Sequence, residues 1–135
     1  MGEPNTATAG RAPVIKPGDV VGYHAAMDVV TGKFKWKIPI TDIANSSSLL
    51  VTDGGLVFTG KPTGEFAALD EETGKQLWQF KTSSSINSPL ITYTHKGVQY
   101  VSVAVGLGGS LPRGQTATRV PGGSSVWTFA LMPNQ

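Results

Sequence analysis

Hydrophobic and polar residues alternate along several short stretches of this chain. From Lys33 to Ile38 the order is Lys-Phe-Lys-Trp-Lys-Ile, and a period of two is typical of a half-buried β-strand. Phe34, Trp36 and Ile38 would therefore share one face of that strand, opposite three lysines. Turn residues such as Asp53-Gly54-Gly55 separate the apolar stretches and favour hairpins. About nine strands are expected, at 20–27, 33–38, 48–52, 56–59, 65–69, 75–80, 89–94, 98–105 and 126–131.

These strands belong to a repeat with a period of 42 residues. The motif Ala-x-Asp-x-x-Thr-Gly-x-x-x-Trp stands at 26–36 and again at 68–78, 42 positions later. The same shift aligns Asn45-Ser46 with Asn87-Ser88. A fixed period of about 40–45 residues is the signature of four-stranded propeller blades. We therefore predict an all-β chain that forms a partial β-propeller, with about two four-stranded antiparallel blades plus part of a third.

The repeats also suggest a domain organisation. They occur near residues 20–38, 48–80 and 89–132, so residues 19–135 are expected to form one incomplete propeller. Residues 1–18 are rich in Gly, Pro, Thr and Ala and predict a flexible N-terminal arm. A propeller needs at least four blades. The chain is then expected to be a fragment of a larger ring, namely the C-terminal end of that ring. The alternative is a unit that assembles as a domain-swapped or oligomeric ring.

Composition excludes several function classes. The net charge is only +2 and the basic residues are scattered, so the chain shows no electrostatic footprint for nucleic acid or an anionic membrane. The sequence has no cysteine, which excludes disulfides and thiolate metal ligands. No apolar run approaches the ~18 residues of a membrane helix, and Met1–Gly10 shows no hydrophobic targeting segment.

Several chemically active side chains have a structural interpretation. Trp36 and Trp78 are expected to fill the space between adjacent blades. Asp28 and Asp70 each stand at the head of a turn, where a carboxylate caps backbone donors. His24 has no partner at metal-ligand spacing, so a surface or edge position is expected for it. We therefore predict neither a catalytic residue nor a metal ligand in this chain.

The repeated motif resembles the tryptophan-docking motif of quinoprotein propellers. Further segments resemble the C-terminal portion of pyrroloquinoline-quinone-dependent alcohol dehydrogenases, the methanol and ethanol dehydrogenase group. They are Thr52–Gly60, Ser88-Pro89 followed by Thr92-Tyr93, Lys96–Val101 and Val105–Gly109. The resemblance covers roughly residues 20–132.

This resemblance implies a cofactor site. In the family, the quinone lies on the pseudo-symmetry axis, between loops that precede the innermost strands and loops that join the second and third strands. In methanol dehydrogenases both loops offer a tryptophan, whereas Ser46 and Ser110 stand at those places here; serine hydroxyls can still donate hydrogen bonds. The implied binders of pyrroloquinoline quinone are Asn45, Ser46, Gly108, Gly109 and Ser110. Calcium or a similar ion, and the catalytic base, would belong to blades that this chain lacks.

The resemblance also implies a function. The parent enzyme would oxidise an alcohol or polyol to a carbonyl in the periplasm and pass electrons to a cytochrome or ubiquinone. This chain would need the remaining propeller blades as partners, and alone it would be inactive. The alternative is a non-catalytic propeller of the same type that acts as a protein-binding scaffold, like outer-membrane assembly lipoproteins. The missing tryptophans favour the scaffold, and the Gly-rich insertion at 106–125 favours the dehydrogenase.

Overall fold

The chain folds into three antiparallel sheets. The computed structural model describes residues 16, 18–41, 47–107 and 120–132, and these contain strands and turns but no helix. The sheets hold two, four and three strands, each strand pairing with its neighbour in sequence. The strands are β1 (Gly22–Met27), β2 (Phe34–Ile40), β3 (Leu49–Thr52), β4 (Leu56–Gly60), β5 (Glu65–Asp70), β6 (Gln76–Lys81), β7 (Leu90–His95), β8 (Val98–Gly106) and β9 (Ser124–Leu131).

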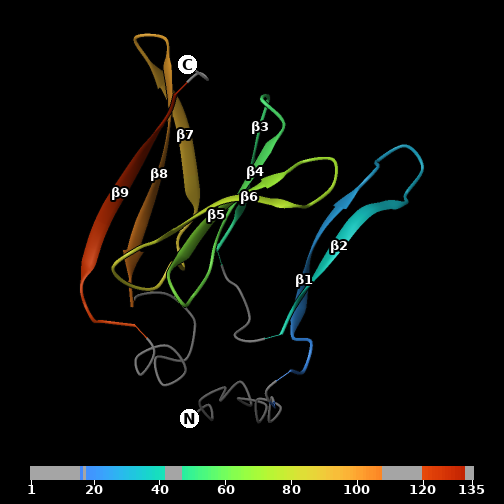
Figure 1. The fold of residues 1–135 in the computed structure, drawn as a ribbon, viewed down its shortest axis with the longest axis horizontal. Helices are drawn as coiled ribbons and strands as arrows, with labels where there is room; N and C mark the ends of the chain where they lie inside the picture. Colours follow the sequence, from blue (N-terminus) through green and yellow to red (C-terminus); the bar gives the residue numbers. More distant parts are fainter. Residues whose placement is uncertain (1–15, 17, 42–46, 108–119, 133–135) are drawn as a thin grey trace, which may run out of the picture.

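The order of the sheets follows the chain. In Figure 1 the β1–β2 hairpin lies at the right, the four-stranded sheet β3–β6 in the centre and the sheet β7–β9 at the left. Such up-and-down sheets, placed one after another, are the blades of a propeller. The predicted fold class is therefore confirmed, with one complete four-stranded sheet between two partial ones. The predicted arm at 1–18 lies almost wholly outside the described residues, and the domain division stays a prediction.

The repeated Asp-x-x-Thr-Gly turns have the predicted structure. Asp70 Oδ1 accepts hydrogen bonds from the Thr73 hydroxyl at 2.6 Å and the Thr73 backbone N–H at 2.8 Å. These bonds lower the pKa of the Asp70 carboxyl below its ordinary value. Asp28 caps the equivalent turn in the first sheet. The turns end at Gly32 and Gly74, whose φ angles of 68° and 70° lie in the left-handed region that favours glycine.

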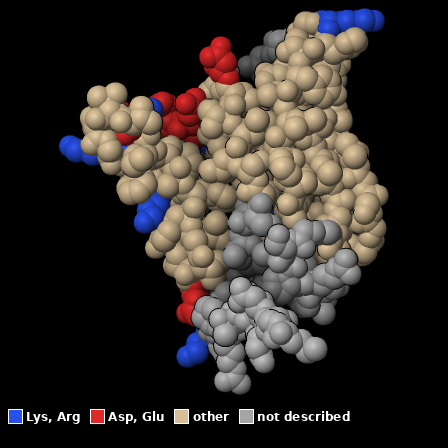
Figure 2. Space-filling view, turned by 180° about the vertical axis from the view of Figure 1, so that it is seen from behind, with Lys and Arg blue, Asp and Glu red and all other residues tan. Residues whose placement is uncertain are grey.

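The main core lies between the second and third sheets. Phe66 is fully buried, and its ring centroid lies 5.1 Å from that of Phe129 and 5.9 Å from that of Trp78. The buried members of this cluster are Phe58, Phe66, Ala68, Ile86, Leu90, Val101, Val103 and Val105. Because the cluster draws on both sheets, burial of apolar surface holds the two together. On the face shown in Figure 2, charged side chains gather around the first sheet, while the surface over the other two carries few.

The first sheet attaches to the second through a tryptophan and an ion pair. The Trp36 indole Nε1 donates a hydrogen bond of 2.8 Å to the backbone oxygen of Glu71. A Cβ added at Gly74 would lie 2.7 Å from the Trp36 ring, so the indole rests directly on this glycine. Lys35 Nζ lies 2.6 Å from Glu72 Oε1. Trp36 therefore has the predicted position between adjacent sheets.

The structure corrects the expected position of one aromatic residue, Phe34, and confirms that of another, Trp78. Phe34 does not share the face of Trp36, because the β1–β2 register shifts between Ala26 and Met27 and a bulge turns following side chains to the other face. The Phe34 side chain is 59% exposed, and Lys37 Nζ lies 5.5 Å from its ring centroid. Trp78 packs edge-on against Phe129 of the third sheet as predicted, with 41% of its surface still exposed.

Candidate functional site

The five residues predicted to bind a cofactor lie outside the described part of the chain. Asn45 and Ser46 belong to 42–46, and Gly108, Gly109 and Ser110 belong to 108–119. Their assignment stays a prediction. Described residues lie near them in the sequence.

A cavity of about 490 Å³ opens at one end of the third sheet. It lies between the segment that precedes β7 and the facing ends of β8 and β9. Its lining residues are Asn87, Ser88, Ala104, Val105, Gly106, Ser124, Ser125 and Val126. Asn87 and Ser88 are the repeat equivalents of Asn45 and Ser46, and Gly106 comes two residues before Gly108. The cavity therefore lies between the loop before β7, the first strand of this sheet, and the end of β8, its second strand. The family resemblance implies a cofactor site between loops of these two kinds.

Sequence reasoning did not single out Asn87 and Ser88 as site residues. The signal was available, because the 42-residue shift aligns them with Asn45-Ser46. The resemblance pointed to the loop before the second sheet, which holds Asn45 and Ser46. The repeat places a similar loop, with Asn87 and Ser88, before the third sheet.

The cavity side chains are fixed by the segment between β6 and β7, in which Thr82 and residues 84–86 are buried. Ser85 is fully buried, and its backbone oxygen accepts a hydrogen bond of 2.8 Å from the Gly106 N–H. Asn87 Nδ2 donates to Ser85 Oγ at 2.8 Å, and the Ser88 hydroxyl donates to the Ala104 oxygen at 2.7 Å. These bonds join the segment to the end of β8 and orient the polar groups that line the cavity.

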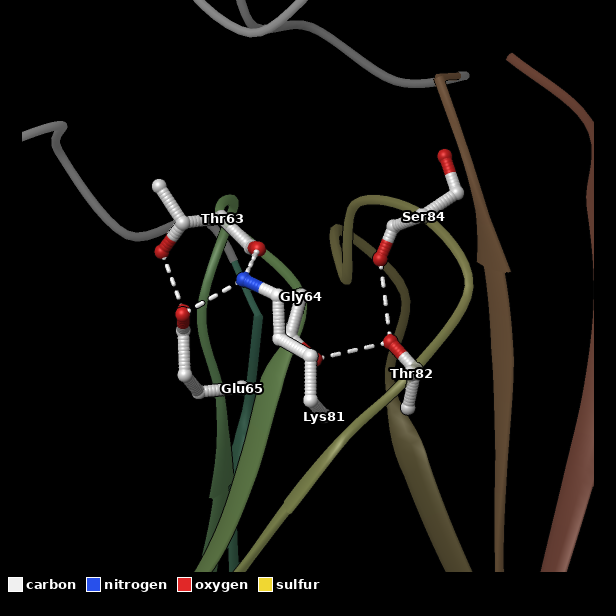
Figure 3. Close-up of polar contacts among 6 residues, drawn as sticks. All are labelled: Thr63, Gly64, Glu65, Lys81, Thr82 and Ser84. Atoms are coloured by element: carbon white, nitrogen blue, oxygen red, sulfur yellow. Dashed lines mark hydrogen bonds and ion pairs between the residues drawn. The ribbon is translucent and has the colours of Figure 1, made fainter. Parts of the chain in front are cut away.

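The other side of this segment is joined to the turn between β4 and β5. The Thr82 hydroxyl lies 2.8 Å from the Gly64 oxygen and 3.0 Å from the Ser84 oxygen, as Figure 3 shows. Gly64 has a φ of 94°, and a Cβ there would lie 2.6 Å from the Ser84 oxygen. The fit therefore requires a glycine at this position.

An ion pair closes the same turn. Lys81 Nζ lies 2.6 Å from Glu65 Oε1 and 2.5 Å from the backbone oxygen of Thr63, whose hydroxyl donates to Glu65 Oε2 (Figure 3). Burial raises the pKa of the Glu65 carboxyl, but the hydrogen bonds from Lys81 and Thr63 outweigh this effect and leave the pKa lowered. Glu65 is therefore an ionised, compensated carboxylate at neutral pH.

The lining of the cavity is uncharged and mainly apolar, with a few polar groups. Its lining offers one amide, three serine hydroxyls and backbone groups, and none of these lining residues is ionisable. The volume falls in the range of about 300–1,000 Å³ typical of ligand pockets. The few polar groups of this lining could hydrogen-bond to pyrroloquinoline quinone, a planar tricarboxylic acid, while cations for its carboxylates would come from elsewhere. Among the described residues, no group of three or more His, Asp or Glu side chains could hold a metal ion.

The described residues also contain no helix long and apolar enough to cross a membrane.

Comparisons with known proteins identify relatives of the chain. The family model described as "Glucose/ethanol/alcohol dehydrogenase, beta-propeller domain" matches residues 5–101. Quinoprotein alcohol dehydrogenase PedH of Pseudomonas putida is 38% identical over 128 residues, a match that covers 87% of this chain and 21% of that protein.

Solved structures give the same picture. A europium-containing methanol dehydrogenase matches with a TM-score of 0.65 and 32% identity, over 78% of this chain and 22% of its own. The quinohemoprotein alcohol dehydrogenase ADHIIG of Pseudomonas putida HK5 matches with a TM-score of 0.67 and 30% identity, over 77% of this chain and 16% of its own. The quinohemoprotein alcohol dehydrogenase of Comamonas testosteroni matches with a TM-score of 0.62 and 31% identity, over 82% of this chain and 17% of its own.

The chain thus spans about a fifth of the length of the curated relative that it matches. Three sheets of β-propeller type, a repeat of blade length and a family match over more than half of the chain agree with one another. The chain belongs to the β-propeller family of the quinoprotein, pyrroloquinoline-quinone-dependent alcohol dehydrogenases.

Proposed function

We propose that this chain is part of the cofactor-binding propeller of a dehydrogenase that oxidises an alcohol or polyol to a carbonyl compound. The observation that supports this most directly is the uncharged cavity at the end of the third sheet, where Asn87 and Ser88 face the ends of β8 and β9. When bound, pyrroloquinoline quinone would supply the two-electron acceptor. Electrons would then pass to a cytochrome or ubiquinone. In keeping with the family, the complete protein would work in the periplasm.

In this proposal the residues of the chain bind and orient the cofactor. The Asn87 amide would hydrogen-bond to its oxygen atoms, while the Ser88 hydroxyl, which donates to the Ala104 oxygen, would hold the segment before β7 against the end of β8. Asn45, Ser46, Gly108, Gly109 and Ser110 would line the same site from the neighbouring loops. The described lining contains no side chain that could act as a general base. The base and the calcium or similar ion are therefore assigned to the other blades of the complete protein.

The test uses the full-length protein reconstituted with pyrroloquinoline quinone and calcium, followed by alcohol-dependent dye reduction. We expect turnover only with the quinone, and an Asn87→Ala variant should need about tenfold more quinone for half-maximal binding, measured by its absorbance. Gln76→Ala is the matched control, because Gln76 is an exposed amide in β6, outside the cavity lining. A full-length protein that neither binds the quinone nor oxidises alcohols would refute the proposal.

That negative result would favour the second candidate, a non-catalytic propeller that binds protein partners. The serines at positions 46 and 110, in place of the two tryptophans of methanol dehydrogenases, are the observation in its favour.

A further inference from the structure

A second cavity lies between the first and second sheets and shares no lining residue with the first. Its volume is about 510 Å³. One wall comes from β1 and β2, and the other comes from the β4–β5 turn and from β6. The lining residues are His24, Ile38, Pro39, Ile40, Thr41, Lys61, Pro62, Thr63, Glu65 and Gln79. Ionisable side chains line this second cavity, whereas the lining of the first cavity contains none.

The charges around this cavity favour an anion. The two ion pairs in the described part of the chain use Lys35 and Lys81, and neither uses Lys61. The carboxylate in the lining, Glu65, is already compensated by Lys81 at 2.6 Å. Because Lys81 offsets Glu65, the Lys61 ammonium carries the net charge among the described residues that line the cavity. A cation would meet this ammonium and is disfavoured.

His24 adds a second group that could contact an anion. His24 lies in β1, an edge strand as expected, and it is half-buried where this strand lines the cavity. Burial lowers the pKa of His24 below its ordinary value, and the nearby charge of Lys61 lowers it further. Both side chains line the same cavity, so an anion held there would lie beside the Lys61 ammonium and favour the protonated form of the imidazole.

The rest of the lining is apolar. Ile38, Pro39 and Ile40 of β2 and Pro62 of the opposite turn provide aliphatic surface beside the charged groups. A ligand that matches both parts has an anionic head and a short apolar body. Inorganic phosphate matches only the charged part.

We propose that this cavity binds a small organic carboxylate with an apolar body, placing its carboxylate between Lys61 and His24 and its body against Ile38, Ile40 and Pro62. The cavity lies wholly within this chain, so the inference does not depend on the proposed function. A carboxylate beside the imidazole would stabilise the imidazolium form. Binding should therefore raise the pKa of His24 and grow stronger as the pH falls toward that pKa.

The chain offers a direct test, because it contains only two histidines, His24 and His95. His95 is exposed at the end of β7 and serves as the internal control. Imidazole proton signals would be followed by NMR across a pH series, with sodium butyrate as the probe and sodium chloride at equal ionic strength as the blank. We expect a saturable upward shift of the His24 pKa with butyrate and no saturable shift for His95.

A pair of lysine variants locates the site. Lys61→Gln should raise the dissociation constant for butyrate about tenfold or more, because it removes a charge-assisted contact. Lys96→Gln, at an exposed lysine in the β7–β8 turn, should leave it unchanged. Both lysines are exposed, so both variants should fold, which circular dichroism would check.

Three results would overturn the proposal. They are the absence of a saturable His24 shift, equal effects of the two lysine substitutions, and binding of butylamine as tight as that of butyrate. Acetate or phosphate binding as tightly as butyrate would contradict the apolar part of the proposed ligand.

Discussion

The contact between Trp36 and Gly74 can be tested with a control that the repeat itself supplies. Gly32 and Gly74 are equivalent positions 42 residues apart, with φ angles of 68° and 70°. A Cβ at Gly74 would lie 2.7 Å from the Trp36 ring, whereas a Cβ at Gly32 would have nothing within 4 Å. The two glycines therefore share the backbone requirement and differ in the packing around them.

The expected magnitudes follow from this difference. An alanine in the left-handed region costs about 1–2 kcal/mol of stability at either position. At Gly74 the added methyl group also displaces the Trp36 ring, and overpacking of this kind costs about 1–3 kcal/mol more. Gly74→Ala should therefore destabilise the chain by about 2–5 kcal/mol, against about 1–2 kcal/mol for Gly32→Ala.

The assay is urea unfolding of the whole chain, followed by circular dichroism, for each alanine variant with and without Trp36→Ala. Removing the indole removes the obstacle, so in that background Gly74→Ala should be no more destabilising than Gly32→Ala. Such a double-mutant cycle isolates the contact between the two residues. If the two glycine variants are equally destabilised in the presence of Trp36, the packing role assigned to this tryptophan is wrong.

Three further outcomes are expected. Phe66→Ala should cost about 3–5 kcal/mol in urea unfolding, because the side chain is fully buried among rings of two sheets; a loss below about 1 kcal/mol would contradict this core. Gly60→Ala should cost about 1–3 kcal/mol, because its Cβ would lie 2.2 Å from Ile86 Cγ2, and an added Ile86→Ala change should remove the extra cost. The lowered pKa of Asp70 stabilises the fold above the pKa of an unfolded aspartate, and this contribution is lost as the pH falls through the folded-state value. Thr73→Val removes the hydroxyl donor, so its stability deficit in pH-dependent melts should shrink on acidification; a deficit independent of pH would count against the Asp70 assignment.

Local patterns in the sequence were enough to predict the strands and turns. Strand alternation and turn residues depend on near neighbours, so the nine strands were located with their ends displaced by a few residues. The carboxylates of Asp28 and Asp70 cap their turns as predicted, since the hydrogen-bond partners lie within three residues. The 42-residue repeat of these strands and turns predicted the propeller fold, and its motif indicated the family.

Positions that depend on distant residues were predicted less well. Phe34 alternates with lysines in the sequence, yet one bulge places it on the same side of the sheet as Lys37. The edge position of His24 was expected, but its half-burial was not, because the opposite wall of its cavity, the β4–β5 turn, is almost forty residues away. The repeat aligns Asn87 and Ser88 with Asn45 and Ser46, but the cavity that they share with β8 and β9 is what marks them as candidate site residues.

The sequence by itself therefore determined the type of element, the repeat and the membership of the quinoprotein dehydrogenase family. The tertiary structure alone decided which faces of the sheets meet and which side chains line the two cavities. The physical reason is that hydrogen bonding within hairpins is local, whereas burial of a side chain depends on the sheet that packs against it.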